Sequence, residues 1–267
     1  MNAYISLGWS DLALAALFLL ANAALSLMMR LGLARQLLVA GARMVVQLLL
    51  VGLVLKWVFG AQSFWITAGL AAVMLAFAGR EVRARQERPL AGIWGWSLGA
   101  GVMAMAGLMV TSFALTVAIR PEPIWSARFA LPLLGMVLGN TMNGVSLGLD
   151  ALLGALARER AAVEARLLLG HDKWSAMLPQ LRRALRAGFT PILNAMAATG
   201  VISLPGMMTG QILSGVDPQE AVKYQLLVMF LIGGATGMGV LGAVLIGAWR
   251  MSDARDRLRL DRLVAGK

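Results

Sequence analysis

The sequence has 267 residues, of which 59% are hydrophobic and only 14% charged, and its formal net charge is +11. Ordinary soluble domains contain about 45–50% apolar and about 25% charged residues, so this composition excludes a typical water-soluble globular protein. The basic residues lie between and after apolar runs rather than on one soluble face, which argues against nucleic-acid binding. The absence of cysteine excludes disulfides and thiolate metal sites.

Seven apolar runs predict seven transmembrane helices, because a helix needs about 20 mostly apolar residues to cross a bilayer. The predicted spans are 11–29, 38–59, 63–79, 92–119, 129–153, 188–214 and 224–249. Such continuous runs favour helices over the alternating strands of a β-barrel. Residues 1–10 lack the basic start of a cleaved signal peptide, so the first run is expected to be retained. We expect an all-α, polytopic helical membrane protein in which residues 1–267 form a single transmembrane domain.

The distribution of basic residues predicts the orientation of these spans. Segments 30–37, 80–91, 154–187 and 250–267 contain most of the arginines and lysines. The alternate connections add only a few more, namely Lys56, Arg120, Arg128 and Lys223. Because cytoplasmic loops carry an excess of Lys and Arg, the N-terminus is predicted outside and the C-terminus inside.

The interval 155–188 is the only long polar stretch between predicted spans, and it is expected to carry function. Gly170 interrupts a helical run, and Trp174 and Leu178 restart an apolar stripe before Pro179. The pattern predicts a helix, a turn and a second helix lying along the membrane surface. An alternative is an interfacial hairpin whose bases merely contact lipid headgroups.

The fifth span contains a candidate pathway. Met136, Asn140 and Asn143 recur at the spacing of one helix face. Two small-residue pairs, Gly135 with Gly139 and Gly144 with Gly148, allow close helix packing. The amides could line a pathway or a dimer seam, or they could simply bond a neighbouring helix, and these roles are compatible.

The sixth span contains the block Ser203-Leu-Pro205-Gly-Met207-Met208. Proline removes a backbone donor, so the helix is expected to kink or unwind there. Non-helical backbone at membrane depth is tolerated where it is buried in protein or lines a water-filled cavity. Met207 and Met208 could be weak, soft metal ligands, or they could be ordinary apolar gap-fillers.

Hard metal ligands are scarce in the predicted spans. Asp150 is the only carboxylate well inside one, and the single histidine, His171, lies in the 155–188 interval. None of the four lysines is followed by Ser or Thr, as a phosphate-binding loop requires, so the chain is expected to bind no cofactor itself. Any ATP would be handled by a partner.

The 155–188 interval resembles the EAA loop of ABC permeases, which docks a short coupling helix onto a cytoplasmic ATPase. The residues that carry this likeness are Glu164, Ala165, Gly170, Trp174, Leu178 and Pro179, although the Leu-Pro pair comes about one helical turn early. On this resemblance they would couple the permease to its partner.

A broader likeness covers nearly the whole chain from the second span onward, and it is to the FetB-type iron-export permeases and their plant aluminium-tolerance relatives. The matching blocks are Gly41-Ala-Arg43, Gln47-Leu, Val51 to Lys56, Pro132 to Met136, Gly139-Asn140, Ser203 to Gly210, Asp217-Pro218 and Lys223-Tyr224-Gln225. The resemblance implies a permease without its own ATPase, located in the inner (plasma) membrane.

This second resemblance also implies partners and a substrate. Two permeases would assemble with two ABC ATPase subunits that bind ATP and Mg²⁺, and the complex would export iron. Two rival hypotheses remain: a permease for another solute, such as a sugar nucleotide or lipid-like molecule, and a membrane scaffold or sensor that recruits a cytoplasmic protein through 155–188.

Overall fold

The computed structural model describes residues 8–61 and 63–264, and within them every regular element is a helix. Residues 1–7 and 265–267, which belong to the predicted N-terminal and cytoplasmic tails, lie outside the described residues, as does Gln62. The helices are α1 (Trp9–Met28), α2 (Ala34–Ala61), α3 (Phe64–Ala84), α4 (Trp94–Phe113), the π-helix η1 (Ala114–Ile119), α5 (Ala127–Arg158), α6 (Arg160–Leu168), α7 (Lys173–Ala198), α8 (Gly206–Leu213), α9 (Pro218–Arg250) and the short η2 (Leu260–Arg262).

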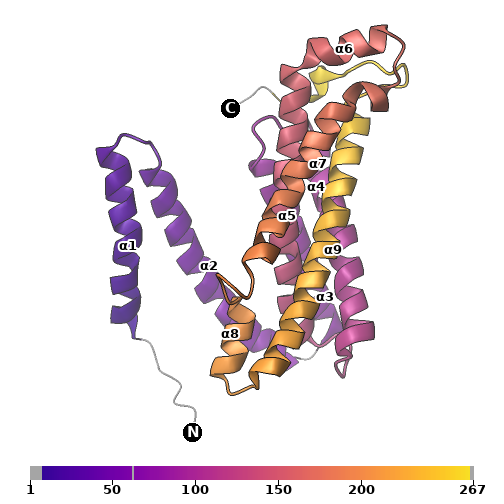
Figure 1. The fold of residues 1–267 in the computed structure, drawn as a ribbon. Helices are drawn as coiled ribbons and strands as arrows, with labels where there is room; N and C mark the ends of the chain where they lie inside the picture. The colour runs from indigo at the N-terminus through magenta and orange to yellow at the C-terminus, as the bar shows by residue number, and fades with distance from the viewer. Residues whose placement is uncertain (1–7, 62, 265–267) are drawn as a thin grey trace. The chain divides into compact units, whose positions relative to one another are not determined.

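The chain divides into two units, of which the first contains residues 1–62 and 213–215. Its α1 and α2 form a helical hairpin (Figure 1). The helices pack closely at Gly41, where a Cβ would lie 2.5 Å from Leu19 Cδ2. The turn between them includes Gly32 at φ +72°, a left-handed conformation that glycine adopts without steric cost.

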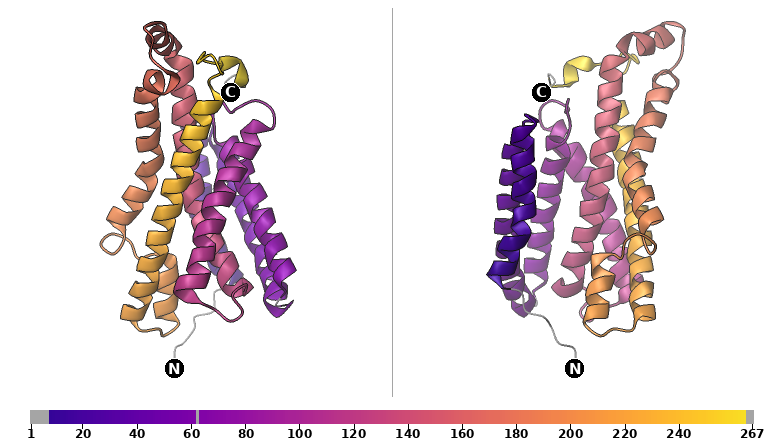
Figure 2. Two further views of the ribbon diagram at one scale, coloured as in Figure 1. Left: turned by 90° about the vertical axis from the view of Figure 1, so that its right-hand side faces the viewer. Right: turned by 60° about the vertical axis from the view of Figure 1, so that its left-hand side comes forward.

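The second unit is built around α5, which packs against α3, α4, α7 and α9 (Figures 1 and 2). Its closest approach to α7 is between two glycines: a Cβ on Gly144 would lie 2.7 Å from the carbonyl oxygen of Gly188. Leu152 and Leu153 of α5, Met177 of α7 and Val240 of α9 are almost fully buried in one apolar cluster. The central helix is therefore held on several sides by tight apolar packing.

Six of the described helices are long and apolar enough to span a membrane: α1, α2, α3, α4 with η1, α5 and α9. Each coincides with a predicted span, so the prediction of a polytopic helical membrane protein is confirmed. The total of seven spans and the N-out orientation remain predictions.

The predicted span 188–214 is not one helix, which corrects that boundary. Helix α7 begins much earlier, at Lys173, and ends at Ala198, while α8 begins at Gly206. Between them Gly200 has φ +87°, and the carbonyl of Ala198 accepts the N–H groups of both Ile202 and Ser203. Pro205 cannot donate a backbone hydrogen bond, so it stands just before the new helix rather than inside one.

The 155–188 interval forms a helix, a turn and a second helix, but its second helix is not a separate surface helix. Helix α7 continues from Lys173 into the bundle beside α5 (Figure 1). Asp172 caps it by accepting the N–H groups of Trp174 and Ser175 at 2.9 and 3.4 Å. The interval is therefore directly continuous with a helix of the bundle.

Candidate functional site

Helix α6 lies across one end of the second unit (Figure 1). It is held there by polar contacts at its start and by apolar packing along its length. The Glu159 carboxylate, between α5 and α6, accepts hydrogen bonds from Arg183 and from Gln180 Nε2 on α7. The bond from Arg183 is the main reason that the pKa of Glu159 lies below its usual value. Val163 of α6 is fully buried against the core that contains Met177. A displacement of α6 would therefore be transmitted to both α5 and α7.

The tip of α6 exposes apolar side chains. Leu168 and Leu169 are 88% and 80% exposed, and Trp174 and Leu178 at the start of α7 are also exposed. Between them, Gly170 turns the chain at φ +90°, with its N–H bonded to the carbonyl of Leu167. Exposed apolar groups gathered beside charged ones are typical of an interaction surface.

The predicted coupling residues gather at this end, although not all at the tip. Ala165, Gly170, Trp174 and Leu178 are exposed, whereas Glu164 and Pro179 are half-buried. Glu164 pairs with Arg160 of the same helix at 2.7 Å. The sequence pattern did not single out Leu168 and Leu169, because their apolar character fits a helix core as well as an exposed tip.

The C-terminal segment, residues 251–264, folds back beside α6, which sequence reasoning missed. The N–H of Val264 bonds the carbonyl of Pro89 at 2.9 Å, and Lys173 pairs with Asp256 at 3.2 Å. The Asp253 carboxylate accepts a hydrogen bond from the backbone N–H of Arg257. This bond is the main reason that the pKa of Asp253 is lowered to about 2. The Arg259 guanidinium likewise lowers the pKa of Asp261 to about 2.

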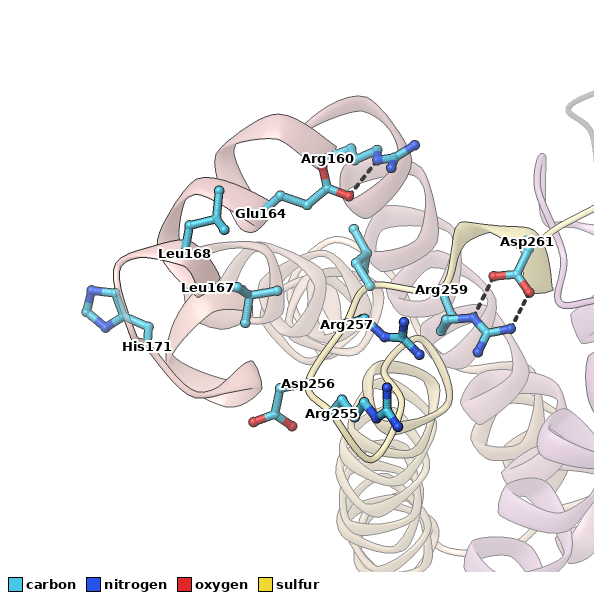
Figure 3. A pocket seen from close by; sticks show the side chains of 11 residues that line it. Arg160, Glu164, Leu167, Leu168, His171, Arg255, Asp256, Arg257, Arg259 and Asp261 are labelled. Atoms are coloured by element: carbon cyan, nitrogen blue, oxygen red, sulfur yellow. Dashed lines mark hydrogen bonds and ion pairs between the residues drawn. The ribbon is translucent and has the colours of Figure 1, made fainter.

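A groove of about 840 Å³ runs between this segment and α6 (Figure 3). Glu164, Leu167 and Leu168 line one side, and charged residues from Arg255 to Asp261 line the other. Dashed lines in Figure 3 mark the Arg160–Glu164 and Arg259–Asp261 pairs along the rim. The end of the second unit thus offers a mixed apolar and charged surface suited to a protein partner.

The candidate pathway residues on α5 share an uncovered face of the second unit. Asn140 and Asn143 are exposed and Met136 is half-buried. Asn140 Nδ2 donates to the carbonyl of Met136 at 2.8 Å, and Asn143 Oδ1 accepts from Arg85 at the end of α3. Among the described hydrogen bonds, Asn143 therefore bonds the end of a neighbouring helix, whereas Asn140 bonds only within α5.

The four packing glycines of α5 differ in their surroundings. A Cβ on Gly144 or Gly148 would meet α7 or α9 at 2.7 and 3.2 Å, and one on Gly135 would meet Met74 of α3 at 3.3 Å. Around Gly139 nothing lies within 4 Å among the described residues. Close helix contact is thus concentrated in the half of α5 that faces α7 and α9.

Met207, after the α7–α8 interruption, packs against the same apolar cluster as Met136 of the predicted pathway. Met207 is half-buried and packs against an apolar cluster that includes Val110, Ile192 and Val228. Met208 is half-buried, and Ser203 is exposed in the interruption. Among the described residues no group of three or more His, Cys, Asp or Glu side chains could hold a metal ion. Met207 therefore has a packing partner in the structure, and its role as a metal ligand remains a prediction.

The sequence was compared with known proteins. The model of the family described as "Uncharacterised protein family (UPF0014)" matches residues 9–251. The UPF0014 membrane protein slr1647 of Synechocystis is 38% identical over 86% of this chain and 88% of its own length. The UPF0014 membrane protein STAR2 of rice is 34% identical, over 86% of this chain and 81% of its own.

A third relative is named the probable iron export permease protein FetB of Escherichia coli, and it is 27% identical over 95% of each chain. No solved structure matches the chain. The family match covers most of the described helices, and the resemblance found in the sequence motifs is confirmed by it. The chain is a multi-pass membrane protein that belongs to the UPF0014 family.

Proposed function

We propose that this chain is the permease subunit of an ABC transporter that exports iron or a related metal species, using ATP and Mg²⁺ bound by a separate ATPase subunit. The observation that carries the proposal is the exposed tip of α6, an apolar surface anchored to two long helices. The name of the FetB relative, a probable iron export permease, supports the direction and the cargo. The proposed assembly contains two permeases and two ATPases.

The anchoring of α6 explains how such a subunit would work. An ATPase that changes shape on binding and hydrolysing ATP would displace the tip at Leu168 and Leu169. Because Glu159 bonds Arg183 and Val163 is buried against α7, that displacement would shift α5 and α7 as a pair. Helix α5 carries Asn140 and Asn143, so the movement would reshape the proposed pathway wall.

Co-purification tests the proposal. The chain is co-expressed with ABC ATPase subunits of the same organism that lack membrane spans, and Leu168→Asp and Leu169→Asp are compared with Val216→Asp. Val216 is 40% exposed in the turn before α9, at the opposite end of that helix from α6 (Figure 1). We expect the two tip variants to lose the ATPase while Val216→Asp retains it, because burying a carboxylate in an apolar contact is costly. An ATPase that never co-purifies with the parent protein would overturn the proposal.

A further inference from the structure

The end of α3 places one arginine on the exposed face of α5. The Arg85 Nη1 atom lies 2.5 Å from Asn143 Oδ1, a contact between residues 58 positions apart. A basic residue that only set the topology of the chain would need no partner inside the helix bundle. This guanidinium is instead directed onto the helix that carries the predicted pathway residues.

Arg85 has no carboxylate partner among the described ion pairs. Asp150, two turns along α5 from Asn143, accepts the backbone N–H of Glu87 at 2.7 Å. Both Arg85 and Asn143 are exposed on the second unit. The Arg85 guanidinium therefore stands exposed on this face, and its described partner is an amide rather than a carboxylate.

Both side chains have N–H groups that are available to donate hydrogen bonds to a ligand. Asn143 uses its oxygen for Arg85, so its Nδ2 amide can donate, and no hydrogen bond of that nitrogen is found among the described residues. The Arg85 guanidinium has further N–H groups beyond the one that Asn143 accepts. Adjacent amide and guanidinium donors match the oxygens of a carboxylate or a phosphate.

We propose that Arg85 and Asn143 form a recognition site for a negatively charged oxygen group on the transported molecule, a carboxylate or a phosphate. This inference rests on the proposed transport function and specifies its substrate class. A bare metal cation passing Asn143 would be repelled by the guanidinium, whereas a metal carried inside an anionic complex would be attracted.

The test is equilibrium binding of labelled citrate to the full-length permease, without ATPase, in phosphatidylcholine nanodiscs. We expect Arg85→Gln and Asn143→Leu to weaken citrate binding at least about tenfold, because each removes a charge-assisted or amide donor. Arg85→Lys keeps the charge and should weaken it less. Arg88→Gln, a neighbouring exposed arginine with no bond to α5 among the described contacts, should leave binding within about twofold.

Two results would overturn the site. One is citrate binding that is unchanged in both Arg85→Gln and Asn143→Leu, and the other is an absence of citrate binding to the parent. A third arm adds phosphatidylglycerol at physiological salt, which screens the bilayer charge beyond about 8 Å. If this lipid abolishes citrate binding, the site holds a lipid headgroup and the substrate assignment fails. Because no ATPase is present, these outcomes are separate from loss of co-purification, which would reject the proposed function itself.

Discussion

At the scale of single residues, Met207 offers two chemistries that a volume-conserving substitution separates. Its side chain packs against the cluster around Val110 and Val228, and no cluster of hard ligands occurs among the described residues. We predict that the Met207→Leu/Met208→Leu double variant keeps its metal-stimulated ATPase activity and changes the free energy of unfolding by less than about 1.5 kcal/mol, because Leu conserves volume. Loss of metal stimulation with intact assembly would instead assign the sulfurs to metal binding.

Asp253 allows a prediction about pH. Its folded pKa of about 2 lies below the ordinary value of 3.8, so its stabilising contribution is present above pH 3.8 and is lost as the pH falls through about 2. Asp253→Asn removes this charge at neutral pH. We expect faster hydrogen exchange at the backbone amides of Arg255 and Arg257, whose N–H groups the carboxylate accepts.

Asp261→Asn is the matched control, because the Asp261 carboxylate bonds the Arg259 side chain rather than the amides of that turn. Exchange at Arg255 and Arg257 should be unaffected in this variant. Equal exchange rates in the parent and Asp253→Asn would show that the carboxylate does not hold the turn.

At the scale of elements, the turn at Gly170 determines how α6 meets α7. Its φ of +90° is strained for a residue with a Cβ, and an added Cβ would meet nothing within 4 Å among the described residues, so backbone strain is the whole cost. We predict that Gly170→Ala costs about 1–2 kcal/mol locally and reduces the coupling of ATP hydrolysis to transport, with insertion unchanged. Gly170→Asn should have a smaller effect than Gly170→Ala, since Asn tolerates left-handed backbone. Equal transport per ATP in the parent and Gly170→Ala would contradict this role.

The interruption between α7 and α8 has its own prediction. Pro205 lies outside both helices, and its carbonyl accepts the N–H of Thr209 as α8 begins. We therefore expect the turn at Gly200 to persist without the proline ring, and Pro205→Ala should leave hydrogen exchange across 199–204 as in the parent. Gly200→Ala should disturb the segment instead, because φ is +87° there. Slow, helix-like exchange in Pro205→Ala would show that proline alone breaks the helix.

These elements also show what the sequence could and could not predict. Long apolar runs located six spanning helices, because bilayer thickness imposes a length that composition reveals. The continuity of α7 was missed, because its charged first half looks like a separate surface helix although it continues into the bundle. The return of residues 251–264 and the Arg85–Asn143 contact depend on long-range packing, which no local periodicity encodes.

At the scale of the whole molecule, the orientation and the partner surface support each other. The tip of α6 and the C-terminal segment lie at the same end of the second unit, and both belong to segments predicted to be cytoplasmic (Figure 2). A reporter fused after Lys267 should therefore be active only in the cytoplasm. A reporter active only outside would place the α6 tip where no ATPase could reach it.

The central claim is that ATP hydrolysed by a partner drives a metal species through this chain. The direct measurement is ATP-dependent accumulation of iron in inside-out vesicles containing both subunits, with iron supplied either free or as its citrate complex. The account predicts accumulation that requires ATP, is lost in Leu168→Asp, is retained in Val216→Asp and is faster with the anionic complex. Accumulation that is independent of ATP or of the partner subunit would contradict it.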